Sequence, residues 1–274
     1  MKRLSVTGAV AVIALTLALP VLPQEKELTR EGQEQFLRTA RVTKSQTLSE
    51  GTTGALKVTL TDGSFTHLGQ FQPIDDYKQI FTSALGTELN FKDTYKANIA
   101  AYRLDKILGL GMIPPSVERT YRGSTGAMTW WLDDVMMTEK ERFLSKKEPP
   151  NAEDWNNQMH IVRVFDQLIY NMDRNLGNLV ITGGWVIHMI DHTRAFRVHK
   201  KVKERKNLVK CDRQIFEALQ GLEPGTLTKE LSPYLTRSEI GAILARRDQI
   251  VKIFESKASE LGEEAVFYDY LSKK

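Results

Sequence analysis

The segment from Leu168 to His192 constrains the fold of this chain more than any other part of the sequence. It places Asp173 five residues before Asn178, and Asp191 thirteen residues after Asn178. Short apolar runs on either side of a Gly-Gly turn fill 179–190 and predict a β-hairpin. Such a hairpin would bring Asn178 and Asp191 within reach of one metal ion. Amide and carboxylate oxygens suit Mg²⁺ and Mn²⁺.

Composition sets wide limits on the class of protein. The chain has 274 residues, of which 41% are hydrophobic and 26% charged, enough for two lobes that share a cleft. Its formal net charge of +4 is modest, so we predict no nucleic-acid partner. Cys211 is the single cysteine, which excludes an intramolecular disulfide and a cysteine-based zinc cluster.

The first 24 residues are typical of a signal peptide or of an uncleaved N-terminal membrane anchor. Lys2 and Arg3 precede an apolar run over 6–19, which Pro20 then ends. The apolar run is a little short for a span of about 20 residues, which favours the signal peptide without excluding the anchor. Either interpretation predicts that the folded part is periplasmic or secreted.

The first half of the folded part predicts an antiparallel sheet with one packed helix. A polar lead-in with a short helix comes first, followed by strands joined by a Gly51-Thr-Thr-Gly54 turn and an Asp62-Gly63 hairpin. The predicted strands are 41–50, 55–60, 65–74, 117–121 and 126–135, and the predicted helix is 93–109. These elements make residues 25–138 a small lobe.

The second half predicts a mostly helical lobe over 139–274. A charged connection ends in Pro149-Pro150, and an amphipathic helix over 154–171 then leads directly to Asp173. After Cys211 the pattern is again helical, over 212–222, 238–257 and 263–271. A helix before the acidic loop and a hairpin after it therefore hold the candidate residues.

Two segments of this half resemble one known group of enzymes. Residues 171–178 (NMDRNLGN) and 189–196 (MIDHTRAF) resemble the atypical kinases: the phosphatidylinositol 3- and 4-kinases, the HipA-type kinases and the secretory-pathway kinases. Residues 99–119 also resemble the small-lobe helix and following strand of HipA-like and secreted-kinase-like proteins. The resemblance implies an α+β fold, namely a two-lobed protein-kinase-like fold.

The resemblance also assigns roles. Asp173 would lie near the acceptor hydroxyl as the catalytic residue, and Asn178 and Asp191 would bind metal. Arg174 would be structural and pair with a carboxylate or a backbone carbonyl near the loop. The implied cofactors are ATP with Mg²⁺ or Mn²⁺, and the backbone of the turn from Gly51 to Gly54 would cover the phosphates.

One departure from the family pattern concerns the phosphate-binding lysine. The family brings a lysine to the α- and β-phosphates from the third strand, where this chain has Gln72, and Lys57 on the preceding strand is the candidate substitute. The helix glutamate that would hold the lysine corresponds to Asn98, with Glu88 nearby. Because a missing ion pair weakens nucleotide positioning, two hypotheses stay open: a kinase acting on an unknown protein or lipid acceptor, or a pseudokinase that binds a nucleotide or a partner without turnover.

Two further features allow other interpretations. His188 and His192 flank Asp191 and suggest a metal-dependent hydrolase, although on one strand His188 would face away from Asp191. The basic run 197–206 suits an acidic protein acceptor, a phosphoinositide headgroup or an anionic membrane surface. A solvated loop is the simpler alternative for this run.

Overall fold

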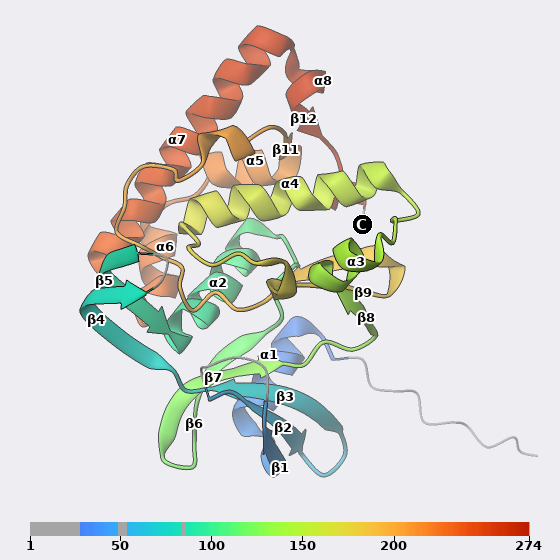
Figure 1. The fold of residues 1–274 in the computed structure, drawn as a ribbon, viewed down its shortest axis with the longest axis vertical. Coiled ribbons are helices and arrows are strands. Elements are labelled where there is room, and N and C mark those ends of the chain that lie inside the picture. Colours follow the sequence, from blue (N-terminus) through green and yellow to red (C-terminus); the bar gives the residue numbers. More distant parts are fainter. Residues whose placement is uncertain (1–27, 49–53, 84–85, 274) are drawn as a thin grey trace, which may run out of the picture.

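The computed structural model describes residues 28–48, 54–83 and 86–273. The chain forms a smaller half built on an antiparallel sheet and a larger, mostly helical half (Figure 1). The fold class predicted from the sequence is therefore confirmed. The proposed signal segment 1–24 and Gly51 lie outside the described residues, and none of the described helices is long and apolar enough to span a membrane.

The smaller half contains a five-stranded sheet in the order β1-β2-β3-β7-β6. Its first three strands form the predicted meander, and the Asp62 carboxylate Oδ1 accepts hydrogen bonds from Ser64 N and Phe65 N, both at 2.8 Å, at the predicted turn. The elements are α1 (Arg30–Thr39), β1 (Arg41–Thr47), β2 (Leu56–Thr61), β3 (Thr66–Gln72), β4 (Asp75–Ser83), β5 (Gly86–Thr94), α2 (Tyr95–Leu108), β6 (Ser116–Tyr121) and β7 (Ser124–Trp130).

The two faces of this sheet have different roles, because side chains alternate along each strand. One face is apolar and packs against α1, through Phe36 and Leu37, in the cluster that also contains Val58, Leu60, Phe71, Val117, Met128 and Trp130. The other face carries polar side chains such as Gln70 and Gln72 and borders a cleft. The predicted lead-in helix is thus part of the core.

Helix α2 packs between the sheet of the smaller half and helices of the larger half, and it also contacts α1. The sequence offers Asp93 or Thr94 as its cap and Gly109 or Gly111 as its end. Thr94 caps the first turn, and Gly109 ends the helix in a left-handed conformation with φ 67°. Arg30 of α1 donates to the buried carboxylate of Asp105 at 2.9 Å. Burial raises the pKa of Asp105 to about 6 despite that guanidinium, and α1 is therefore fixed to α2 by a buried charge.

The hairpin of β4 and β5 was not predicted. Its strands are rich in charged and polar residues and lack clear alternation, because the hairpin forms its own two-stranded sheet. It reaches from the smaller half toward α6 and α7 (Figure 1). There Lys92 pairs with Glu239 in a buried site, and Glu88 pairs with Arg194 and Arg197, each at 2.6 Å.

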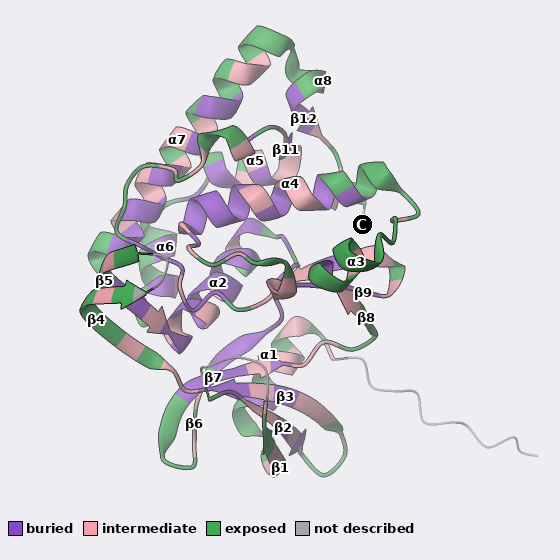
Figure 2. Ribbon diagram, in the orientation of Figure 1, coloured by how far each residue is buried: buried purple, intermediate pink, exposed green. Residues whose placement is uncertain are grey.

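The larger half surrounds helix α4, whose inward side is buried (Figure 2). A three-stranded sheet in the order β10-β9-β8 lies beside it. Strand β8 pairs with β9 and therefore belongs to this sheet, although its residues lie in the predicted small lobe. The lobe boundary at 138/139 stays a prediction. The elements are β8 (Val135–Thr138), α3 (Glu139–Ser145), α4 (Ala152–Ile169), β9 (Leu179–Thr182), β10 (Val186–Met189), β11 (Cys211–Asp212), α5 (Arg213–Gln220), α6 (Pro224–Leu231), α7 (Arg237–Leu261), α8 (Glu263–Val266) and β12 (Phe267–Tyr268).

The buried pair of Lys92 and Glu239 should stabilise the contact between the two halves. Both side chains are only 8% exposed, so Lys92→Met would leave the buried Glu239 carboxylate with its hydrogen bonds from Thr236 but without the Lys92 cation. We expect the free energy of unfolding to fall by about 3 kcal/mol, measured by urea denaturation.

Lys78→Met is the matched control, since Lys78 lies on the same hairpin and pairs with Asp76 at 47% and 43% side-chain exposure. Exposed pairs contribute at most about 1 kcal/mol. Equal losses in the two variants would contradict the role assigned to Lys92.

Candidate active site

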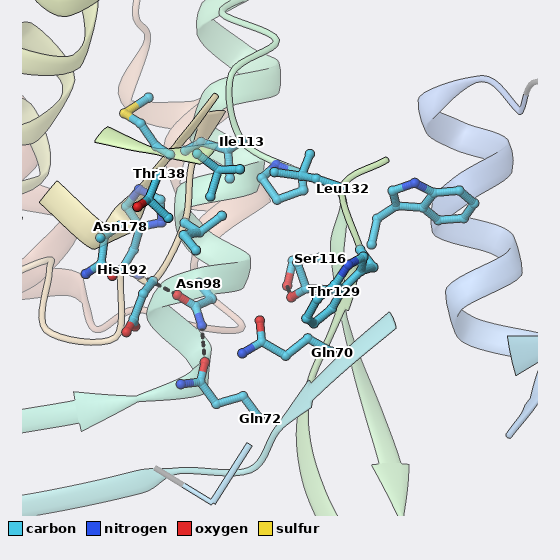
Figure 3. A pocket seen from close by; sticks show the side chains of 18 of the residues that line it. Gln70, Gln72, Asn98, Ile113, Ser116, Thr129, Leu132, Thr138, Asn178 and His192 are labelled. Carbon is cyan, nitrogen blue, oxygen red and sulfur yellow. Dashed lines mark hydrogen bonds between the residues drawn. The ribbon is translucent and has the colours of Figure 1, made fainter. Parts of the chain in front are cut away.

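A cleft of about 610 Å³ lies between the two halves. Gln70, Gln72 and Thr129 of the sheet line one side, and Asn178 and Asp191 line the other (Figure 3). This volume is within the range typical of small-molecule and cofactor sites, about 300–1,000 Å³. The cleft therefore has room for a ligand between the sheet and the predicted metal ligands.

The predicted hairpin after the acidic loop is confirmed. Strands β9 and β10 are antiparallel, with Met189 opposite Leu179. Just beyond this pair, Ile190 N donates to the carbonyl oxygen of Asn178 at 3.0 Å. The open end of the hairpin thus brings Asn178 next to Asp191, as the sequence spacing required.

The acidic loop itself begins where α4 ends, at Tyr170 in a left-handed conformation with φ 52°. The exposed Asp173 is held by its backbone: its N–H donates to Asn171 Oδ1 at 3.0 Å, and its carbonyl oxygen accepts from Asn178 Nδ2 at 3.3 Å. The carboxylate of Asp173 is left facing solvent. The amide of Asn178 keeps its oxygen Oδ1 as the atom that can coordinate a cation.

Arg174 has the structural role that the resemblance implied. Its guanidinium donates to Asp166 of α4, with Nε to Oδ2 at 2.9 Å. Nη1 donates to the carbonyl oxygens of Asn178 and Ile190, each at 3.0 Å. Nη2 lies 3.0 Å from Nε2 of the buried His192, and burial followed by this guanidinium lowers the pKa of His192 well below its ordinary value. His192 is therefore a neutral acceptor rather than a titrating group.

Asp191 lies in strongly negative surroundings. Its backbone is left-handed, with φ 51°, and its Oδ1 accepts from the hydroxyl of Thr193 at 3.1 Å. Asp191 is an exposed residue that lines the cleft. Desolvation by the surrounding protein raises the pKa of its carboxyl, and the charges of Asp93 and Asp173 add to the shift. A divalent cation would relieve that repulsion.

Asp93 is a residue of the site that the sequence did not identify, because its position before a helix suggested only a cap. Thr94 caps the helix instead. Among the described residues, the buried Oδ1 of Asp93 has no hydrogen-bond partner. Thr94 N donates to Thr193 O at 3.0 Å, which places Asp93 beside the Asp191 segment. The charge of Asp93 acts on Asp191, and oxygens such as those of Asn178 and Asp191 suit a hard divalent cation.

Gln72 and Asn98 lie opposite each other. They are the residues at which the sequence resemblance implied a lysine and a glutamate. Asn98 Nδ2 donates to Gln72 Oε1 at 2.6 Å (Figure 3). Glu88, the other candidate acid, pairs with Arg194 and Arg197 instead. Two neutral amides therefore face each other at the positions where the sequence resemblance implied an ion pair.

Lys57 lies on β2, between β1 and β3, and is not among the described residues that line the cleft. It is opposite Gln70 in the β2–β3 ladder, and its Nζ is 4.1 Å from the centroid of the Trp131 ring, which lines the cleft. Gly54 is exposed, with φ 64°. Leu48, which lines the cleft, donates from its N–H to Ala55 O at 3.0 Å. The phosphate-binding roles of Lys57, Gly51 and Gly54 stay predictions.

The histidines do not form a metal centre. His188 lies 3.1 Å from the hydroxyl of Thr182, whereas His192 contacts Arg174. Over the described ranges, no group of three or more His, Cys, Asp or Glu side chains is arranged to hold a metal ion. The hydrolase interpretation has no geometric support.

The raised pKa of Asp191 gives a prediction for Asp191→Asn. A carboxylic acid with a raised pKa costs stability when ionised, so the cost is present above the ordinary pKa of about 4 and is absent below it. We expect the variant to unfold at a higher temperature than the wild type at pH 7 and at the same temperature below pH 4. Asn tolerates the left-handed backbone as well as Asp does.

Thermal unfolding at both pH values tests this, with the exposed Asp269→Asn as control. A lower midpoint for Asp191→Asn at pH 7 would show that the carboxylate stabilises the fold.

No protein-family model matches this chain, and no curated protein does. Solved structures do. A Fam20 protein of hydra, solved with sugar, has a TM-score of 0.67 at 17% identity, over 88% of this chain and 92% of its own. The Golgi casein kinase with Mn/ADP bound gives 0.63 at 14% identity, over 88% and 80%. The proinflammatory kinase CtkA of Helicobacter pylori gives 0.51 at 11% identity, over 82% and 98%. The chain therefore has the fold of these atypical, secretory-pathway-like kinases, as the sequence resemblance predicted.

Proposed function

We propose that this chain is an ATP- and metal-dependent phosphotransferase. An oxygen of an acceptor hydroxyl bonds to the γ-phosphorus of ATP, the bond from that phosphorus to the β,γ-bridging oxygen breaks, and ADP leaves. The observation that carries the proposal is the gathering of Asp173, Asn178 and Asp191 at one end of the β9–β10 hairpin, beside the interlobe cleft.

In this proposal Asp173 orients the acceptor hydroxyl and takes its proton. Its exposed carboxylate suits contact with a large acceptor, while its backbone is fixed through Asn171 and Asn178. Such positioning, rather than covalent chemistry, is what phosphoryl transfer asks of a protein.

Asn178 and Asp191 would hold Mg²⁺ or Mn²⁺. The metal would supply charge neutralisation at the phosphates and at the leaving oxygen. Lys57 and the turn from Gly51 to Gly54 would position the phosphates from the sheet side. The structural similarity to a kinase with Mn/ADP bound supports nucleotide and metal use, and the carboxylates around Asp191 support a cation.

We place the acceptor, a protein or a lipid, outside the cytoplasm on the basis of the N-terminal segment. The basic run 197–206 would contact an anionic acceptor or a membrane surface. Its exposed cations Lys200, Lys201, Lys203, Arg205 and Lys206 support this role. The backbone of the run is anchored, since Gln167 Oε1 accepts from Glu204 N and Arg246 donates to His199 O.

The alternative is a pseudokinase that binds nucleotide without turnover. The observation in its favour is the neutral pair of Gln72 and Asn98, since the ion pair that it replaces positions the α- and β-phosphates in kinases.

An assay with radiolabelled ATP separates these hypotheses. We expect the full chain, with Mn²⁺ or Mg²⁺, to transfer label to casein, the acceptor in the name of one structural relative, or to itself. Asp173→Ala should lower the rate of transfer about 100-fold or more. Asp191→Ala should abolish the metal-dependent transfer, because it removes a metal ligand. Asp269→Ala, an exposed carboxylate outside the cleft lining, is the control.

If no label is transferred, thermal unfolding with ATP and Mn²⁺ distinguishes the remaining explanations. Metal-dependent stabilisation by ATP without transfer of label would support the pseudokinase. Neither stabilisation nor transfer would contradict nucleotide binding in both hypotheses.

A further inference from the structure

A chain of hydrogen bonds between amides crosses the cleft. Asn98 Nδ2 donates to Gln72 Oε1 at 2.6 Å, and Asn98 Oδ1 accepts from the backbone N–H of His192, also at 2.6 Å (Figure 3). We call Gln72, Asn98 and the His192 N–H the amide relay. It joins three separate parts of the chain: strand β3, helix α2 and the segment that follows β10.

The relay reaches the backbone directly beside a proposed metal ligand. His192 follows Asp191, which has φ 51°, a left-handed conformation that is uncommon for residues other than Gly. On the other side of Asp191, the carbonyl oxygen of Ile190 accepts from Arg174. The peptide groups before and after Asp191 are therefore fixed by different lobes: Arg174 holds the first, and Asn98 holds the second.

The partners of Asn98 leave its orientation little freedom. Its amide has a donor and an acceptor end, and the two ends meet complementary groups, the oxygen of Gln72 and the N–H of His192. Gln72 is 4% exposed, so its amide is held in the sheet and orients Asn98 in turn. Loss of Gln72 would loosen Asn98 without removing the bond to His192.

The relay carries no charge, unlike the ion pair of the family. It consequently cannot neutralise phosphates, and it needs no nucleotide to form. None of the described residues that line the cleft is Lys or Arg. Lys57, which would act on the phosphates, lies beside this lining over the Trp131 ring, so the charge within the lining itself would come from the metal.

We infer that Asn98 is a positioning residue for the metal site: through His192 N–H it holds Asp191 in the conformation that binds a divalent cation before nucleotide arrives, and Gln72 acts through Asn98. This inference rests on the proposed function only in taking Asp191 as a metal ligand. It predicts that the nucleotide-free protein binds Mn²⁺, and that the relay sets the affinity.

The test is Mn²⁺ binding to the full chain without nucleotide, measured by electron paramagnetic resonance of free Mn²⁺. Residues that orient metal ligands typically change affinity by about 10- to 100-fold when replaced. We expect Asn98→Ala to weaken binding about 10-fold and Gln72→Ala about threefold, since a single neutral hydrogen bond is lost. The double variant should match Asn98→Ala alone, because Gln72 acts through Asn98.

Arg103→Ala is the matched control. Arg103 lies on the same helix and makes a contact with the larger half, to Glu230 at 3.3 Å, but does not line the cleft. A merely structural role for the relay would instead make the losses of Asn98→Ala and Gln72→Ala additive. If Asn98→Ala does not fold, Gln72→Ala alone still tests the inference.

The outcomes separate this inference from the proposed function. An affinity for Mn²⁺ that Asp191→Ala abolishes and that Asn98→Ala and Gln72→Ala change less than twofold would overturn the relay alone. Metal-dependent ATP binding with no Mn²⁺ binding in the absence of ATP would also overturn it. No Mn²⁺ binding with or without ATP would overturn the metal site of the proposed function.

Discussion

The geometry of the cleft depends on the guanidinium of Arg174. It binds the Asp166 carboxylate of α4, the carbonyl oxygens of Asn178 and Ile190, and the ring of His192. A planar group with five donors can satisfy acceptors from a helix, a loop and both strands of a hairpin at once. Without it, the carbonyl oxygen of Asn178 would keep only the N–H of Ile190, and that of Ile190 would lose the guanidinium donor beside Asp191. The arrangement of the acidic loop therefore depends on one half-buried cation.

Negative charge is the second constraint on the site. Asp93 and Asp173 both act on Asp191, whose pKa burial has already raised, and Asp93 keeps a buried oxygen without a hydrogen bond among the described residues. Such an arrangement costs free energy in the folded state unless a cation binds. The neutral amide relay between Gln72 and Asn98 adds order to this site without adding charge. A metal ion would thus serve both the fold and the proposed chemistry.

The two halves are joined next to the site rather than through the β8 connection alone. Strand β5 carries Lys92 to Glu239. The N–H of its last residue, Thr94, donates to Thr193 O, next to Asp93. The hairpin that contains it pairs with residues of the segment after Asp191 through Glu88. The position of Asp191 relative to the sheet is accordingly set by contacts from both halves, of which the relay is the most direct.

The sequence by itself determined the local parts of the site. The spacing of Asp173, Asn178 and Asp191, with apolar runs between them, required a loop and a hairpin, because strand alternation and Gly-Gly turns act over a few residues. The meander was predictable for the same reason, as was a cap of α2 at Asp93 or Thr94. The sequence also placed Gln72 and Asn98 opposite each other, by resemblance to a known pattern.

Only the tertiary structure decided how distant side chains combine. The β4–β5 hairpin has no alternation to reveal it, since its burial comes from contacts such as Lys92 with Glu239, 147 residues away. The sequence suggested Asp93 only as a cap, and its buried oxygen emerged when β5 came to lie beside the Asp191 segment. The bond from Asn98 to His192 N–H, across 94 residues, depends on the closure of two lobes. Pair contacts of this kind follow from packing, which no local pattern encodes.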